Sequence, residues 1–469
     1  MNWRLALRIL SSVFLIFFKS DFILSQQILL SREKSIVSDD SQELLGMLGD
    51  KVLVFGNQGV RYELDIYDQE LQYLKTKELF FEKQKVDIQT VVRTKDEFAV
   101  LYSYYHKLNL VSHIRKYNSE GVLLDSLKLP EDESGMDIGS FMPFLSKNHG
   151  MLLLVKPLTY YSMDMILIDL TKLEIIWYQE HAFESYNLER DLANIAVRDN
   201  GEVYLVFEKN NFGWQKNKHH QHIFIIFPGD KQLKDLKLPF QGKLTADFDL
   251  VFDEKNGKVV GSGLYAERSV ENAAGFFSYA LKDGSLEKDL IFTPFSIKLL
   301  KNNPSGKRKI KKELNDLRIG DVLVKNDGGL MMFIETRKEL TRESARNRYT
   351  DYYFEDIFLI CTRPDGSLFW DDQIRKYQLS YDDEAKYSSY FLFATPSSVR
   401  LVFNDEIKDE NTISEYVFSP LGPGKRKSLF STDLHRMKLM FSKALQVSSD
   451  SFLVPSLSEG KYRVVFVQY

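Results

Sequence analysis

Two stretches, KYRVVFVQY at residues 461–469 and QQILLSR at residues 26–32, decide the fold that this sequence predicts. The first is the eighth copy of an apolar strand that recurs along the sequence, and no further strand follows it. The second is a strand candidate that precedes the first copy and has no neighbouring strand to pair with. We therefore expect residues 26–32 to supply the missing partner of residues 461–469.

A tight polar turn between two apolar strands is the first recurring landmark. Asn-Gly and Asp-Gly pairs supply the positive φ angles that two-residue hairpin turns need. From Gly49 to Ser449, seven intervals cover about 400 residues, so the mean period is about 57 residues. The eight turns lie at Gly49-Asp50, Lys95-Asp96, His149-Gly150, Asn200-Gly201, Asn256-Gly257, Asp327-Gly328, Ser397-Ser398 and Ser449-Asp450.

The second landmark is an apolar strand that ends in a polar turn, and it alternates one for one with the first. If the strands of each unit are labelled A to D, the first landmark is the A–B turn and the second is strand C with its C–D turn. The eight C strands are predicted at residues 62–68, 111–118, 165–170, 222–229, 275–284, 356–366, 415–424 and 461–469.

A four-stranded unit repeated around a ring is a β-propeller. The sequence therefore predicts an all-β chain of eight four-stranded blades, in which the N-terminal strand closes the last blade. Such a closure removes the free sheet edges that otherwise invite aggregation. Seven blades, or two packed β-domains, remain as alternatives.

The composition agrees with a single folded β domain over residues 26–469. Aromatic residues make up 13% of the chain, and they favour strands, whereas 12 Pro and 25 Gly are too few for a disordered or collagen-like protein. The net charge of −4 excludes the strong basic excess of a nucleic-acid-binding protein.

The first 25 residues are typical of a signal peptide. Arg4 and Arg8 precede the apolar run Ile9–Phe18, which is too short to span a bilayer, and cleavage is expected between Ser25 and Gln26. An uncleaved anchor is the alternative. No later segment is apolar for long enough to cross a membrane, so we expect an exported protein that is soluble or peripherally attached to the envelope. A single cysteine, Cys361, excludes an intrachain disulfide and favours the bacterial periplasm, outer surface or medium.

Two units contain a further pattern. The stretches IDLTKLEIIW (168–177) and CTRPDGSLFW (361–370) resemble the Asp–turn–Gly–strand–Trp pattern of quinoprotein-type propeller repeats, although Leu173 stands where that pattern has Gly. The resemblance implies that each Trp docks onto a neighbouring blade. Residues 356–404, with GSLFW, RKYQLSYDDEAKYSSY and LVFND, are similar to exported propeller-like proteins of Bacteroidota, a group that implies no particular activity.

The loops predict a binding face. In an antiparallel blade the A–B and C–D turns lie on one rim, and the B–C and D–A connections lie on the other, which we call the B–C/D–A rim. Several B–C connections are long and rich in Tyr, Trp, His and Arg, residue types that dominate binding energy at interfaces. The basic segment SGKRKIKK (305–312) lies on the same rim. We expect this rim to bind a protein, peptide or glycan through Tyr104, Tyr105, His106, Tyr160, Tyr161, Trp214, His220, His222, Arg348, Tyr349 and Tyr353.

The sequence contains weaker signals for a metal site or a catalytic site than for a binding face. His220 and His222 share one face of a strand, but no third metal ligand is near them in the sequence, so a surface histidine cluster is the favoured interpretation. The acidic groups Asp371-Asp372 and Asp382-Asp383-Glu384 fit solvated loops, because adjacent side chains on an extended chain diverge. We predict no metal, no cofactor and a non-enzymatic binding or scaffolding role. The alternative is a propeller enzyme that acts on a glycan or redox substrate in the axial channel.

Overall fold

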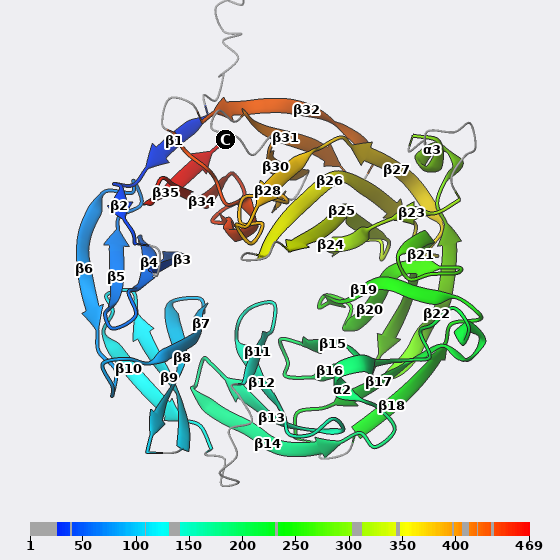
Figure 1. The fold of residues 1–469 in the computed structure, drawn as a ribbon, viewed down its shortest axis with the longest axis horizontal. Helices are drawn as coiled ribbons and strands as arrows, with labels where there is room; N and C mark the ends of the chain where they lie inside the picture. Colours follow the sequence, from blue (N-terminus) through cyan, green and yellow to red (C-terminus); the bar gives the residue numbers. More distant parts are fainter. Residues whose placement is uncertain are drawn as a thin grey trace, which may run out of the picture.

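The computed structural model describes residues 26–37, 40–107, 109–130, 141–229, 233–302, 312–343, 348–395, 398–405, 412–419, 421–432 and 436–469. These residues form eight antiparallel sheets arranged in a ring (Figure 1). The predicted eight-bladed β-propeller is therefore confirmed, and the alternatives of seven blades or two packed domains are not what the structure shows. The signal peptide and most of the basic segment 305–312 lie outside the described residues.

Blades 1 to 4 follow one another along the chain, and each runs from an innermost A strand to an outermost D strand. Their strands are β3 (Ser41–Leu48), β4 (Lys51–Asn57), β5 (Tyr62–Tyr67) and β6 (Tyr73–Leu79); β7 (Asp87–Arg93), β8 (Glu97–His106), β9 (Asn109–Asn118) and β10 (Leu123–Lys128); β11 (Met142–Leu145), β12 (Met151–Pro157), β13 (Ser162–Asp169) and β14 (Glu174–Ala182); β15 (Leu192–Val197), β16 (Val203–Lys209), β17 (His220–Ile226) and β18 (Leu233–Pro239).

Blades 5 to 8 continue the ring, and the last blade takes its D strand from the N-terminal side of the chain. Their strands are β19 (Leu244–Asp253), β20 (Lys258–Ala266), β21 (Asn272–Lys282) and β22 (Ser285–Pro294); β24 (Leu317–Val324), β25 (Leu330–Glu343), β26 (Arg348–Thr362) and β27 (Leu368–Ile374); β29 (Phe391–Ala394), β30 (Val399–Asn404), β31 (Thr412–Ser419) and β32 (Gly422–Ser431); β33 (Leu445–Gln446), β34 (Ser451–Ser458), β35 (Lys461–Gln468) and β1 (Gln27–Leu30).

The ring closes as the sequence predicts. Strand β1 pairs antiparallel with β35, with Gln27 opposite Gln468 and Leu30 opposite Val465. The backbone amide of Val464 donates to Ser31 Oγ at 2.8 Å, which extends the pairing beyond the strand. Residues at the two extremes of the described chain thus belong to one sheet.

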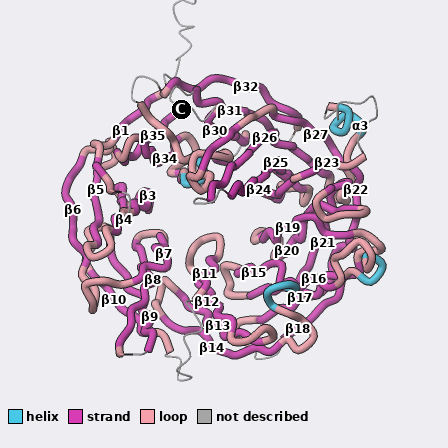
Figure 2. Tube along the Cα trace, viewed as in Figure 1, coloured by secondary structure: helices cyan, strands magenta, loops and turns pink. Residues whose placement is uncertain are grey.

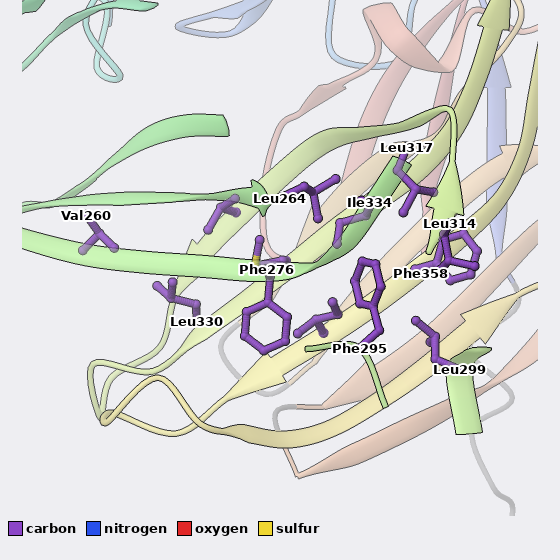
Figure 3. Close-up of a cluster of buried hydrophobic side chains, with 14 of the residues drawn as sticks. Val260, Leu264, Phe276, Phe295, Leu299, Leu314, Leu317, Leu330, Ile334 and Phe358 are labelled. Carbon is purple, nitrogen blue, oxygen red and sulfur yellow. The ribbon is translucent and has the colours of Figure 1, made fainter. Parts of the chain in front are cut away.

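The core lies between blades. Among the described residues, eight hydrophobic clusters each join two consecutive blades. In the cluster of Figure 3, Leu264 and Phe276 of blade 5 face Ile334 and Phe358 of blade 6. The alternating side chains of each strand therefore fill both neighbouring interfaces, which fixes the order and spacing of the blades.

The two tryptophans of the Asp–turn–strand–Trp pattern pack in such interfaces. Trp177 lies against the cluster shared by blades 3 and 4, and Trp370 against the cluster shared by blades 6 and 7. The single cysteine, Cys361, is buried in the same blade 6–7 cluster.

The two rims differ in structure. The described helical turns all fall on the B–C/D–A rim: α2 (Leu188–Asp191), α3 (Ile297–Lys301), η1 (Lys216–Lys218) and η3 (Phe441–Lys443) (Figure 2). Three short additional strands add to the same rim: β2 (Lys34–Ser35), β23 (Leu314–Asn315) and β28 (Gln378–Tyr381). None of the helices in the described ranges has the length and apolar composition that a membrane span needs.

Candidate functional site

The predicted rim residues fall on four blades. Tyr105, Tyr160, Tyr161, Trp214 and Tyr349 have between 45% and 81% of their surface exposed. His106 and Arg348 are also exposed, whereas Tyr104, His220 and Tyr353 are partly buried. Blades 2, 3 and 4 are consecutive, and blade 6 is separated from them by blade 5 (Figure 1). The structure thus presents these residues along an arc and does not gather them into one pocket.

His222 is the exception among them, because its side chain is buried. Both histidines belong to strand β17 and not to the loop before it. His222 Nδ1 lies 2.5 Å from the hydroxyl of Tyr186, and Nε2 lies 2.7 Å from Asp235 Oδ2. Burial lowers the pKa of His222. The interpretation of His220 and His222 as a surface histidine cluster is therefore wrong for His222, which ties its own strand to β18 and to blade 3.

Within the described chain, no three His, Cys, Asp or Glu side chains gather closely enough to hold a metal ion.

The loop of blade 4 between β16 and β17 is firmly held by blade 5. Asn211 Nδ2 donates to Thr245 O at 3.0 Å, and its Oδ1 accepts from Thr245 N at 3.1 Å. Lys216 Nζ donates to Glu267 O at 2.9 Å. A Cβ atom at Gly213 would lie 2.6 Å from the carbonyl oxygen of Arg268, so only glycine permits this close approach. The loop is consequently a fixed platform for the aromatic side chains that it carries.

Acidic groups lie on the innermost A strands of blades 5 and 6. Asp247 Oδ2 accepts from the backbone amide of Ile319 at 2.8 Å, and Asp249 Oδ1 accepts from Asn194 Nδ2 at 3.3 Å. Burial raises the pKa of Asp247, Asp249 and Asp321. Asp247 and Asp249 thus connect consecutive A strands across blade boundaries. These bonds give both carboxyls a structural role, so the acidic groups on these A strands do not by themselves favour the enzyme alternative.

Glu208 belongs to a second interblade network. Its carboxyl accepts from Gln221 Nε2 at 2.9 Å and from Asn211 Nδ2 at 2.8 Å, and Gln221 Oε1 accepts from the hydroxyl of Tyr279 in blade 5 at 3.1 Å. Burial raises the pKa of Glu208 to about 7. The network anchors the base of the aromatic loop to the next blade.

A cleft of about 450 Å³ opens on the B–C/D–A rim where blades 6, 8 and 1 approach one another. The connection 382–389, which follows strand β28, forms part of its lining. In that connection Tyr387 Oη donates to Leu457 O of blade 8 at 2.7 Å. Ser389 Oγ donates to the buried carboxylate of Glu335 in blade 6 at 2.8 Å. The connection therefore crosses from blade 6 to blade 8 and is fixed at both ends.

The sequence pattern gives no signal for this cleft. Asp382 and Glu384 are exposed, as expected of a solvated acidic loop, but their loop also lines the cleft. The same expectation is wrong for Asp371 and Asp372, because both belong to strand β27 and Asp371 is buried. Asp382, Glu384, Ala385 and Ser389 all have left-handed φ angles of 50–69°. Glycine or asparagine would have indicated such a conformation in the sequence, and neither occurs in this stretch. Only the tertiary contacts hold it.

No protein-family model and no curated protein matches the chain. Among solved structures, the WD40 domain of SCAP from fission yeast aligns with a TM-score of 0.43 and 11% identity, over 95% of this chain and 98% of that one. The β-propeller domain of the Trilobed protease from Pyrococcus furiosus aligns with a TM-score of 0.38 and 12% identity, over 83% and 94% of the two chains.

A protein of unknown function from Bacteroides caccae aligns with a TM-score of 0.29 and 12% identity, over 71% and 93%. These values are too low to carry an argument, so the fold assignment rests on the strand pairing of the chain itself. The similarity of residues 168–177 and 361–370 to quinoprotein-type repeats, and of residues 356–404 to Bacteroidota proteins, therefore remains a resemblance in sequence only.

Proposed function

We propose that this chain is a binding propeller that captures a protein partner on its B–C/D–A rim. The observation that carries the proposal is the aromatic pair Phe212 and Trp214 on the loop of blade 4. Their rings stack with centroids 6.2 Å apart and an angle of 19° between the planes. Trp214 is 81% exposed and Phe212 is 46% exposed. Exposed tryptophans on a fixed platform are typical of the few residues that dominate protein–protein binding energy.

The neighbouring blades extend this aromatic surface. Tyr160 and Tyr161 of blade 3 and Tyr105 of blade 2 are each at least half exposed. Tyrosine gives a large contact area with little conformational entropy to lose, because its side chain has only two rotatable bonds. The arc from blade 2 to blade 4 is therefore the surface on which we place the partner.

A photo-crosslinking amino acid at position 214 tests the proposal. We expect it to form a discrete adduct with a protein in native extract, and unlabelled wild-type protein should compete with it. The combined substitutions Phe212→Ala and Trp214→Ala should weaken retention of that same protein by roughly 100-fold, since each of two such anchors contributes about 1–2 kcal/mol.

Position 421 provides the matched control. Leu421 is 84% exposed and lies in the turn between β31 and β32, on the opposite rim. The same crosslinker there should give no such adduct. Equal adducts at both positions would contradict the proposal, and retention of a glycan in place of a protein would assign the rim to carbohydrate binding.

We also propose that the protein acts after export, in the bacterial periplasm, at the outer surface or in the medium. The basic and apolar pattern of residues 1–25 supports this, and strand β1 begins at Gln27, directly after the expected cleavage site. Mass spectrometry of protein from the native envelope should give Gln26 as the first residue. A peptide that retains Arg4 or Arg8 would contradict cleavage.

A further inference from the structure

Three side chains that line the cleft hold buried polar atoms for which the described residues provide no hydrogen-bond partner. These atoms are Nε2 and Oε1 of Gln42, Oγ of Ser388 and Oη of Tyr462. The three residues are 9%, 0% and 4% exposed. Buried polar groups are almost always paired with protein or with ordered water, so such a concentration beside one cleft marks places where a further polar partner fits.

The surrounding structure makes room for these groups. Gln42 lies opposite Gly56 in the pairing of β3 with β4. A Cβ atom at Gly56 would lie 2.9 Å from Gln42 Nε2, so the amide occupies the space that any other side chain would fill. Tyr462 is held in strand β35 and Ser388 in the fixed connection 382–389. The unpartnered atoms therefore have defined positions.

The charges around the cleft balance once Glu335, the partner of Arg337, is counted, so the partly exposed guanidinium of Arg337 is the feature that favours an anionic group. Arg337, Lys386 and Lys443 line it, against Asp40 and Glu384. Arg337 Nε is bonded to Glu335 Oε2 at 2.7 Å, and about a third of the Arg337 side chain remains exposed. A guanidinium that is fixed in this way can accept a second carboxylate without first losing rotamer freedom.

The apolar part of the lining favours a peptide side chain over a sugar ring. Met440 and Leu457 form an aliphatic wall. Phe354 is buried, and the guanidinium carbon of Arg337 lies 5.3 Å from the centre of its ring. The ring of Phe354 is thus occupied by an arginine and does not offer a free face for stacking.

We propose that this cleft binds the C-terminal end of a peptide. The terminal carboxylate meets Arg337 and Lys443, and the amide of Gln42 pairs with a peptide group, donating through Nε2 and accepting through Oε1. Ser388 and Tyr462 bond the remaining polar atoms, and an apolar side chain packs on Met440 and Leu457. This site is separate from the aromatic arc and stands whether or not that arc binds a protein.

Fluorescence binding of two peptide pools to the chain from residue 26 tests the inference. One pool contains acetylated pentapeptides with a free terminal carboxylate, and the other contains the same sequences with a terminal amide. We expect at least tenfold tighter binding of the free acids, because one charge-assisted hydrogen bond is lost in the amides. Equal binding of the two pools, or no binding of either, would overturn the inference.

Three conservative variants separate binding from folding. Tyr462→Phe, Ser388→Ala and Gln42→Met each remove only polar atoms that have no partner, so melting temperatures should be equal or higher. Each variant should bind the free-acid pool about tenfold more weakly. Tyr178→Phe, which removes a hydroxyl bonded to Asp164 on the outer strand of blade 3, is the matched control and should bind normally.

A lower melting temperature in all three variants would show that the polar atoms support the fold, and it would overturn the inference. Binding of polygalacturonate fragments that the same variants abolish would also overturn it, in favour of an acidic glycan. Normal crosslinking at position 214 in these variants would show that a failure here is independent of the proposed function.

Discussion

Removal of residues 26–32 should lower the free energy of unfolding by roughly 5 kcal/mol, because three apolar side chains of β1 leave the core. Ile28 and Leu30 pack against the cluster between blades 7 and 8, and Leu29 against the cluster between blades 8 and 1. The deletion also exposes the backbone edge of β35, so we expect oligomers or aggregates. Denaturant unfolding and light scattering of the shortened chain measure both effects.

The peptide QQILLSR added in trans is the control for this deletion. It should restore part of the stability in a concentration-dependent manner, since it binds only the folded ring. Replacement of Arg32 by Ala, which leaves the strand intact, should change the free energy of unfolding by less than about 1 kcal/mol. A shortened chain that is as stable and as monomeric as the full one would show that β1 does not close the ring in solution.

Replacement of Lys376 by Met should destabilise the protein by about 3 kcal/mol, because the buried carboxylate of Glu335 then keeps only the partly exposed Arg337 as an ionic partner. Lys376 Nζ lies 2.7 Å from Glu335 Oε1, and both side chains are fully buried. Lys376 also donates to the carbonyl oxygen of Phe354 and to Gln378 Oε1. Burial lowers the pKa of Lys376, whereas Glu335 raises it. Chemical denaturation at pH 7 measures the loss.

Lys258 provides the matched comparison. Its ammonium lies 2.9 Å from Glu287, but about a third of each side chain is exposed. Lys258→Met should therefore cost less than about 1 kcal/mol, as exposed ion pairs do. If the two lysine variants were equally mild, the buried carboxylate of Glu335 would not depend on Lys376 as a counter-charge in solution. If Lys376→Met also frees the connection 382–389, peptide binding in the cleft should fall with it.

The architecture was predictable because its signals are local and repeated. The hairpin turn at Asn200-Gly201, for example, indicates its own geometry wherever it occurs in a chain. The pairing of residues 26–32 with residues 461–469 was predictable for a different reason. In a closed ring of four-stranded blades every strand has a partner. Residues 26–32 had no neighbour in the sequence and the last blade lacked its D strand, so the two were expected to pair.

The site was predictable only in part. An aromatic loop such as that of Trp214 is visible in the sequence, because a long polar insertion between two strands must lie on a rim. The burial of His222 was not visible, since its partner Tyr186 comes from the preceding blade connection. The cleft was hidden for the same reason. Gln42, Ser388 and Tyr462 are far apart in the sequence, and only the packing of blade on blade brings them together.

The closure of the ring has a consequence for how the chain acquires its structure. The bond between Ser31 and Val464 joins positions 433 residues apart, which is a very large loop to close. A nascent polypeptide can form blades 1 to 7 as they emerge, but the ring stays open at both ends of the chain. It closes only when β35 is available to pair with β1. Contacts between residues that are so far apart in the sequence form slowly. We therefore expect a long-lived intermediate with an open ring that depends on chaperones. Before the ring closes, such a chain can still pass through a translocation channel.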